Sequence, residues 1–558
     1  MHEHRVTAED IIGASLARWC KQSFPGLPFS EIPAPLNLQH ATAVIDFINF
    51  IQVYELQEAT YWFTSAYAHL VGDQHRKDLA MFFTPPSLTK RLLDDLAASG
   101  VDFANRSFCD PACGGAAFLT PIAMRMRSLL LAKGVTPEEV LKHVQAHLYG
   151  IDRDKTLCKL SQHFLLMTLH EEVTATGLIP QFQVLQGDSL LHSTQLVDAL
   201  DVVVCNPPFR KMKAQEVQVY FSEFSDIIEG QPNLYSLFVV LCVRLLSQGG
   251  ICALVTPTSF LSGQYFSKLR TFLLAQSQLL SIGMVSDRQG VFMDVEQETA
   301  LTLVKRKDNE HSRPSVTDVC VVSPDGEYVY VGQCSLPSSG SAWPIPRTES
   351  DIPLLRSAAK SGVTLAEYGY SIRIGAFVWN RDHRPTYVSA KCAARAKGES
   401  AIPLIWSSDI AGDGSLRFNG YPKDNMEPCF VNLGSKSHRS IVKNPSVILQ
   451  RVTSNDQSRR LIAANVPDEI FNTYGGFVGE NHIVIIEQVV PMPVLPPAQL
   501  TQLLGTPTVD RCFRCISGAT NVSAFELKQL RLPNPSRLKK YLTEGHNIAE
   551  AAKRALET

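Results

Sequence analysis

DVVVCNPPF, residues 201–209, joins a run of apolar residues to two consecutive prolines. Apolar residues after an aspartate predict a buried strand, and proline ends it because proline lacks an amide hydrogen and has a fixed φ. The strand would place Asn206 and Phe209 at the carboxyl edge of a sheet, where open α/β folds bind ligands. Asn-Pro is also a common turn. The motifs in the neighbouring strands are therefore needed to distinguish an ordinary turn from a ligand site.

Three strands before this one are each expected to end in an aspartate. Asp110 leads into PACGGAAF, residues 111–118, a turn of small residues that lets backbone approach a nucleoside. Asp152 ends the next strand, where a carboxylate can accept hydrogen bonds from ribose hydroxyls, and Asp188 ends the strand after that. A single aspartate in such a place is commonly a helix N-cap. Three in this order, followed by Asn206, indicate a ligand site.

The rest of the chain divides by its patterning. Short β-rich runs alternate with helical patterns from about residue 80 to 307, which predicts βαβ units and a Rossmann-like, doubly wound α/β sheet. Apolar residues at helical spacing precede this segment, and turn-rich text follows it. We therefore expect a helical region at 1–75, an α/β domain at 76–310, a linker at 311–350 and an α+β domain at 351–558.

Composition limits the possible classes of protein. The 558 residues are 45% hydrophobic and carry a net charge of −2, so the whole molecule is not a polycation. Residues 365–460 nevertheless hold fourteen Lys and Arg against eight Asp and Glu, a local excess of six. No apolar run is long enough to span a bilayer, and we expect a cytoplasmic location with no membrane partner. The one C-x-x-C, Cys512 and Cys515, lacks a second pair, so no metal is expected.

The ordered motifs resemble the gamma group of DNA amino-methyltransferases, the N6-adenine branch found in restriction–modification systems. The family's F-x-T-P-P element matches residues 82–86, and its D-P-A-C-G-x-G-x-F loop matches residues 110–118. Its N-P-P-[FY] motif matches residues 206–209. The family's second loop glycine is Ala116 here, and alanine fits that position if φ is negative.

This resemblance implies a site-specific DNA adenine-N6 methyltransferase that uses S-adenosyl-L-methionine. It implies catalytic roles for Asn206, Pro207, Pro208 and Phe209, and stacking of the target base on Phe209 and Phe292. The residues that it assigns to the cofactor are Thr84, Asp110, Ala112, Gly114, Asp152, Asp188 and Pro208.

The chemistry accounts for these residue types. The lone pair of adenine N6 is delocalised into the ring, which makes the amine a poor nucleophile. Two acceptors, the side-chain oxygen of Asn206 and the carbonyl of Pro207, would localise that pair without a strong base. The base has to leave the duplex stack to reach them, and the ring of Phe209 would support it there.

The second domain resembles the target-recognition domain that follows such catalytic domains. IRIG at 372–375, QRVTS at 450–454 and RRLIAA at 459–464 carry the likeness. It implies double-stranded DNA as a partner, with phosphate contacts from basic side chains that set the register. A separately encoded restriction endonuclease is a possible second partner. The arginines expected to contact DNA are Arg373, Arg451, Arg459 and Arg460.

Three other functions stay open. Cytosine N4 is an equivalent amine, and the same fold could methylate it. RNA and protein methyltransferases also use an N-P-P-aromatic turn, although they are usually compact and lack a C-terminal domain of this size. A restriction enzyme with its own nuclease is disfavoured because the region before Thr84 is short and holds no P-D followed by D/E-x-K.

Overall fold

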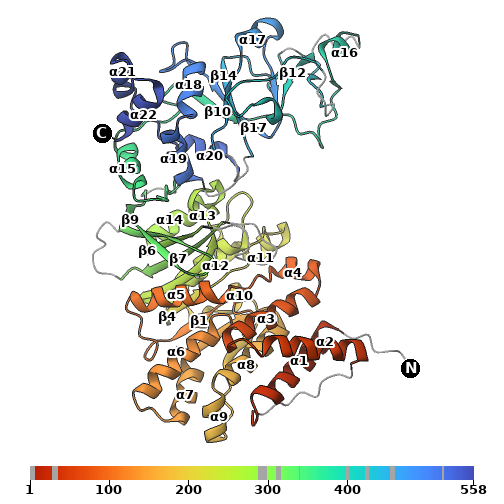
Figure 1. Ribbon diagram of the computed structural model, residues 1–558, viewed down its shortest axis with the longest axis vertical. Helices are drawn as coiled ribbons and strands as arrows, with labels where there is room; N and C mark the ends of the chain where they lie inside the picture. Colours follow the sequence, from red (N-terminus) through yellow and green to blue (C-terminus); the bar gives the residue numbers. More distant parts are fainter. Residues whose placement is uncertain are drawn as a thin grey trace. The chain divides into compact units, whose positions relative to one another are not determined.

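The computed structural model of the chain forms two compact units (Figure 1). The first comprises residues 1–260 with 265–340, and the second comprises 261–264 with 341–558. The structure describes residues 7–27, 36–286, 298–308, 316–337, 340–395, 401–421, 427–435, 437–452, 459–517 and 521–557.

A nine-stranded sheet forms the centre of the first unit, in the order β3-β2-β1-β4-β5-β7-β6-β8-β9. Strands β1 to β5 pair in parallel, whereas β7 runs antiparallel to both β5 and β6. The predicted doubly wound sheet is therefore confirmed, with two antiparallel strands, β7 and β9, added. The strands are β1 (Phe108–Asp110), β2 (Leu148–Asp152), β3 (Gln183–Gln186), β4 (Leu200–Cys205), β5 (Leu246–Pro257), β6 (Ser277–Val285), β7 (Thr299–Arg306), β8 (Val316–Val322) and β9 (Tyr328–Ser335).

The strand order reverses between β1 and β4, which lie side by side with Phe108 opposite Val202. Strand β1 is buried from Phe108 to Asp110, and β4 is buried from Val202 to Cys205. In open α/β sheets a ligand crevice lies at the carboxyl ends of the strands at such a reversal. The motifs after β1 and β4 therefore share one edge of the sheet.

Helices surround this sheet. The predicted helical N-terminal region is present, and it packs into the sheet domain's own core. Trp19 of α1 stacks on Phe63 of α3, and both meet Phe164 of α8 edge-on. The helices of this unit are α1 (Ala8–Ser23), α2 (Leu38–Ile51), α3 (Leu56–Leu70), α4 (Asp73–Leu79), α5 (Pro86–Ala98), α6 (Leu119–Ala132), α7 (Pro137–His147), α8 (Lys155–Thr168), α9 (His170–Thr176), α10 (Ser189–His192), α11 (Ala214–Phe224), α12 (Leu234–Leu245), α13 (Ser259–Ser262, reaching into the second unit) and α14 (Ser267–Gln276).

The segment that we expected to be a linker, 311–350, contains two strands of the sheet. Strands β8 and β9 form a hairpin around Gly326, which has a φ of +87°. Its turn residues SPDG, 323–326, resemble linker text, but apolar residues in VTDVCVV, 316–322, supply a strand that pairs with β6. The linker prediction was wrong for these two strands, because the same residue types form the turn of a hairpin and a linker between domains.

The second unit has the expected α+β composition. One four-stranded sheet has the order β10-β17-β14-β15, and the other has the order β11-β13-β12-β16. No helix among the described residues of either unit is long and apolar enough to cross a membrane. The strands are β10 (Tyr370–Ile374), β11 (Thr386–Tyr387), β12 (Ala401–Ile405), β13 (Phe430–Asn432), β14 (Ser446–Gln450), β15 (Ala463–Asn465), β16 (Val478–Gly479) and β17 (Ile483–Gln488). The helices are α15 (Asp351–Ser361), α16 (Ala390–Arg395), α17 (Asp468–Tyr474), α18 (Pro497–Leu504), α19 (Pro507–Ile516), α20 (Ala524–Gln529), α21 (Pro535–Thr543) and α22 (Ile548–Glu557).

Candidate active site

A cavity of about 870 Å³, open to solvent, lies at the carboxyl edge of the large sheet. The side chains that follow β1, β2, β3 and β4 converge on it, as their positions at the strand ends predict. Loop residues before α5 complete the wall. The sequence-predicted residues that line the cavity are Thr84, Asp110, Ala112, Gly114, Asp152, Asp188, Asn206 and Pro208.

Two of the carboxyl groups have raised pKa values: that of Asp110, which is buried, and that of Asp152, which is half-buried. Burial raises the pKa of Asp110 to about 8, against a smaller opposing effect of the hydrogen bond from the Ala112 amide. Burial likewise raises the pKa of Asp152 to about 6. Isolated buried carboxylates are unfavourable, so a ligand that brings positive charge or hydroxyl donors suits this cavity.

The loop after β1 is bound to the end of β2. The amide of Gly114 donates to Asp152 Oδ2 at 2.9 Å, and Gly114 has a φ of +50°. At Gly115 a Cβ atom would lie 1.7 Å from the Cγ2 of Thr64, so no larger residue fits. Ala116 has a φ of +63°, which corrects the expectation of a negative φ at this position. The loop therefore keeps the glycine-like conformation although it carries an alanine.

Asn206 lies at the end of β4 with one half of its amide fixed. Its Nδ2 donates to the carbonyl of Phe82 and to the hydroxyl of Thr84, both at 2.9 Å. The carbonyl can only accept, so the nitrogen has to face it. In the described part of the chain, the buried Oδ1 of Asn206 has no hydrogen-bond partner. The protein thus presents an orphaned acceptor beside the cavity, and a donor on a ligand would satisfy it.

The aromatic residue of the motif packs against another ring. Phe209 is half-buried and meets Tyr235 edge-on, with ring centroids 6.1 Å apart. The hydroxyl of Tyr235 is hydrogen-bonded to Ser259 at 2.8 Å, which anchors the pair. Phe292, the second expected stacking residue, lies outside the described residues.

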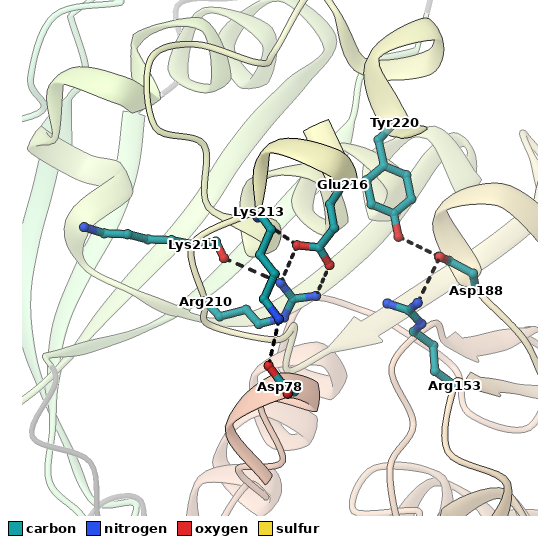
Figure 2. Close-up of polar contacts among 8 residues, drawn as sticks. All are labelled: Asp78, Arg153, Asp188, Arg210, Lys211, Lys213, Glu216 and Tyr220. Atoms are coloured by element: carbon teal, nitrogen blue, oxygen red, sulfur yellow. Dashed lines mark hydrogen bonds and ion pairs between the residues drawn. The ribbon is translucent and has the colours of Figure 1, made fainter. Parts of the chain in front are cut away.

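The polar side chains that line the cavity without having been predicted include Asp78, Arg153, Arg210 and Tyr220 (Figure 2). Arg153 directly follows Asp152 and Arg210 directly follows Phe209, so adjacency to a motif was a usable signal for these two. Nothing in the sequence marked Asp78 or Tyr220, because contacts between separate elements bring them to the site.

The arginines expected to contact DNA belong to the second unit and are largely engaged within it. Arg373 forms an ion pair with Glu487 at 3.1 Å, and Arg451 donates to the carbonyl of Asn481 at 3.0 Å. Arg459 donates to the carbonyls of Gly505 and Gly412, which ties two loops together. Arg460 is only 7% exposed, which corrects the expectation that it lies along a duplex.

No group of three or more His, Cys, Asp or Glu side chains that could hold a metal ion occurs among the described residues. Cys512 and Cys515 are both buried on α19, and burial raises the pKa of each thiol to about 12. Both residues therefore resemble small buried hydrophobic side chains.

Comparison with known proteins identifies the first unit. Residues 58–331 match the family model described as N-6 DNA Methylase. The type II methyltransferase M.BsuBI of Bacillus subtilis is 24% identical over 471 residues, 83% of this chain and 89% of that one. M.PstI of Providencia stuartii is 23% identical over 361 residues, 60% of this chain and 65% of that one.

A solved structure has a similar fold over nearly the whole chain. The type IIL restriction-modification enzyme MmeI, determined in complex with DNA, aligns with a TM-score of 0.59 at 13% identity. The alignment covers 98% of this chain and 86% of MmeI. Through residues 58–331, the chain belongs to the N-6 DNA methylase family.

Proposed function

We propose that this N-6 DNA methylase transfers a methyl group from S-adenosyl-L-methionine, bound in the cavity, to an adenine N6 that Asn206 and Pro207 hold. The observation that carries the proposal is the buried, unpartnered Oδ1 of Asn206, noted above for the described residues. An amino group is one of the donors that would satisfy such an acceptor. The chain would act as the modification enzyme of a restriction–modification system.

The residues around the cavity fit this cofactor. Its α-ammonium and sulfonium groups carry positive charge, which would stabilise the ionised form of the dry Asp110 carboxyl. Its ribose hydroxyls are donors for Asp152, and its adenine amine is a donor for Asp188. We assign Thr84 to the methionine end, with Ala112, Gly114 and Pro208 as walls. When bound, this cofactor supplies the electrophilic methyl group.

The protein's part in catalysis is to position and polarise the amine. Thr84 and Phe82 hold the Asn206 side chain, so Oδ1 keeps its direction without reorganisation. The carbonyl of Pro207 is the second acceptor, and proline's fixed φ restricts its orientation. The flipped base would stack on Phe209, whose contact with Tyr235 keeps the ring in place. Base–aromatic stacking contributes roughly 1–3 kcal/mol.

DNA contacts are assigned to the second unit, with its excess of basic residues between 365 and 460. Arg373 and Arg451 are half-buried and retain accessible surface, which supports a role in phosphate contact. Arg459 is equally half-buried and keeps its proposed phosphate contact, whereas Arg460 is assigned a structural role because its side chain is buried. A separately encoded endonuclease remains a proposed partner.

The test is to map modified bases in the DNA of cells that express only this chain, beside cells that express Asn206→Ala. We expect N6-methyladenine at one sequence motif with the natural chain and at none with the variant. If N4-methylcytosine were found at a fixed motif, the target base would be cytosine and not adenine. Modified RNA or protein with unmodified DNA would overturn the proposal.

A further inference from the structure

The carboxyl group of Asp188 is held from two sides at the wall of the cavity. Its Oδ1 accepts from the amide of Leu190 at 3.1 Å, and its Oδ2 accepts from the hydroxyl of Tyr220 at 2.6 Å. The guanidinium of Arg153 lies 3.9 Å from the same Oδ2 (Figure 2). Each carboxylate oxygen accepts two bonds, so Asp188 retains acceptor capacity after these contacts.

Tyr220 is suited to hold this carboxylate in one orientation. It is a buried residue of α11 and lines the cavity. Burial, and next the neighbouring Asp188, raise the pKa of Tyr220, so the hydroxyl stays protonated at neutral pH. A protonated phenol beside a carboxylate donates, and such charge-assisted bonds are short and strong.

The helix that carries Tyr220 is itself fixed at its first turn. Glu216 accepts two bonds from the Arg210 guanidinium and one from the amide of Lys213. The Nζ of Lys213 reaches Asp78 at 3.0 Å, which joins this turn to the end of α4 (Figure 2). Tyr220 therefore projects from a helix whose first turn is held in place by these contacts.

We propose that Tyr220 is a positioning residue for the adenine of the cofactor. The hydrogen bond from Tyr220 to Asp188 opposes the electrostatic attraction of Arg153. The carboxylate thereby stays oriented to accept a hydrogen bond from an exocyclic amine in the cavity. The inference rests on the proposed function, because the amine is that of S-adenosyl-L-methionine. It predicts selection for a 6-aminopurine over a 6-oxopurine, since a carbonyl facing the carboxylate would place acceptor against acceptor.

The experiment compares two ligands by titration calorimetry: S-adenosylhomocysteine and its deaminated analogue, S-inosylhomocysteine. The natural chain should bind the first more tightly. Tyr220→Phe removes only the hydroxyl, and Asp188 then turns toward Arg153. The variant should lose about three- to tenfold in affinity for S-adenosylhomocysteine and little for the analogue. The ratio of the two affinities should fall by the same factor.

Two further variants separate positioning from pocket shape. Tyr330→Phe removes a Tyr–Asp hydrogen bond, to Asp318, from an exposed site on β9 and should leave both affinities unchanged. Asp188→Asn should reduce the preference by itself, and adding Tyr220→Phe to it should change the preference no further. An additional loss in the double variant would show that Tyr220 acts without Asp188 and would overturn the inference.

The remaining outcomes are also decisive. Equal loss for both ligands, or no loss for either, in Tyr220→Phe overturns the positioning role while leaving the proposed function standing. A natural chain that binds neither ligand overturns the proposed function and this inference together. A natural chain without a preference shows that Asp188 does not read the amine, and it overturns the inference alone.

Discussion

The side-chain amide of Asn206 donates to the hydroxyl of Thr84 at 2.9 Å, linking the end of β4 to the loop before α5. The F-x-T-P-P and N-P-P-F motifs therefore meet through a hydrogen bond as well as through the cavity that they share. Nδ2 is occupied by Thr84 and by the Phe82 carbonyl, and Oδ1 has no partner among the residues that the structure describes. The proposed function depends on the orientation of this oxygen, which has to accept a hydrogen bond from the amine of the target base.

Thr84→Val should lower the rate of methyl transfer by about tenfold. The substitution removes one of the two acceptors that orient Asn206, and a typical hydrogen bond contributes about 0.5–1.5 kcal/mol. Thr84→Ser keeps the hydroxyl and should stay within about threefold of the natural rate. Single-turnover methylation measures both variants. Equal rates for valine and serine would show that this bond does not orient the amide.

Asp152→Asn should weaken binding of S-adenosylhomocysteine by about tenfold or more. The carboxylate would accept from ribose hydroxyls, and hydrogen bonds to charged groups contribute about 1.5–3 kcal/mol. Asparagine is close in size and can still accept from the Gly114 amide, so the loop is retained. Calorimetry gives the affinity. An unchanged affinity would move the ribose contact to another residue.

Asp110 should make the unliganded protein less stable as pH rises from about 6.5 to 8. With a folded-state pKa of about 8, against about 3.9 when unfolded, the folded state binds the extra proton in this window. Stability then falls with pH, by up to about 1.4 kcal/mol per pH unit. Urea unfolding at three pH values measures the slope.

Asp110→Asn should flatten that slope, because the amide does not titrate. Asp152 contributes little above pH 6.5, since its pKa of about 6 leaves it mostly ionised there. Asp46→Asn, at an exposed position on α2, is the control and should keep the natural slope. The same slope in Asp110→Asn as in the natural chain would assign the effect to another group.

Arg451→Ala should weaken binding to all DNA sequences and reduce the log–log salt slope by about 0.9, the value for one phosphate contact. Arg460→Ala should instead lower stability and leave the salt slope unchanged, because this side chain is buried. Competition titrations at several salt concentrations separate the two. A changed slope in Arg460→Ala alone would reverse these assignments.

The part of the site that follows from local pattern could be predicted. Asp110 and Asp152 end strands, and Asn206 and Asp188 follow one and two residues after theirs. Parallel strands bring their carboxyl ends to one edge, so order in the sequence becomes proximity in space. In the second domain, the strands next to QRVTS and within RRLIAA pair with each other, with Ile448 of β14 opposite Ala464 of β15.

What depends on contacts between distant segments could not be predicted. Tyr220 reaches Asp188 only because α11 packs over the cavity, and no motif marks it. Arg460 is basic in a basic stretch, yet its backbone amide is bound to the buried Asp510 and its side chain is enclosed. The left-handed conformation of Ala116 is set by the loop around it, against the preference of its own side chain.

The most direct test of the central claim is the single-turnover rate of Asn206→Ala on a duplex that carries the mapped recognition site. The variant loses a preorganised acceptor, so we expect a rate at least about a hundredfold lower, or roughly 3 kcal/mol. Affinities for DNA and for S-adenosylhomocysteine should stay within about twofold, which separates chemistry from binding. A rate near that of the natural chain, with binding intact, would contradict the role of Asn206 and the mechanism built on it.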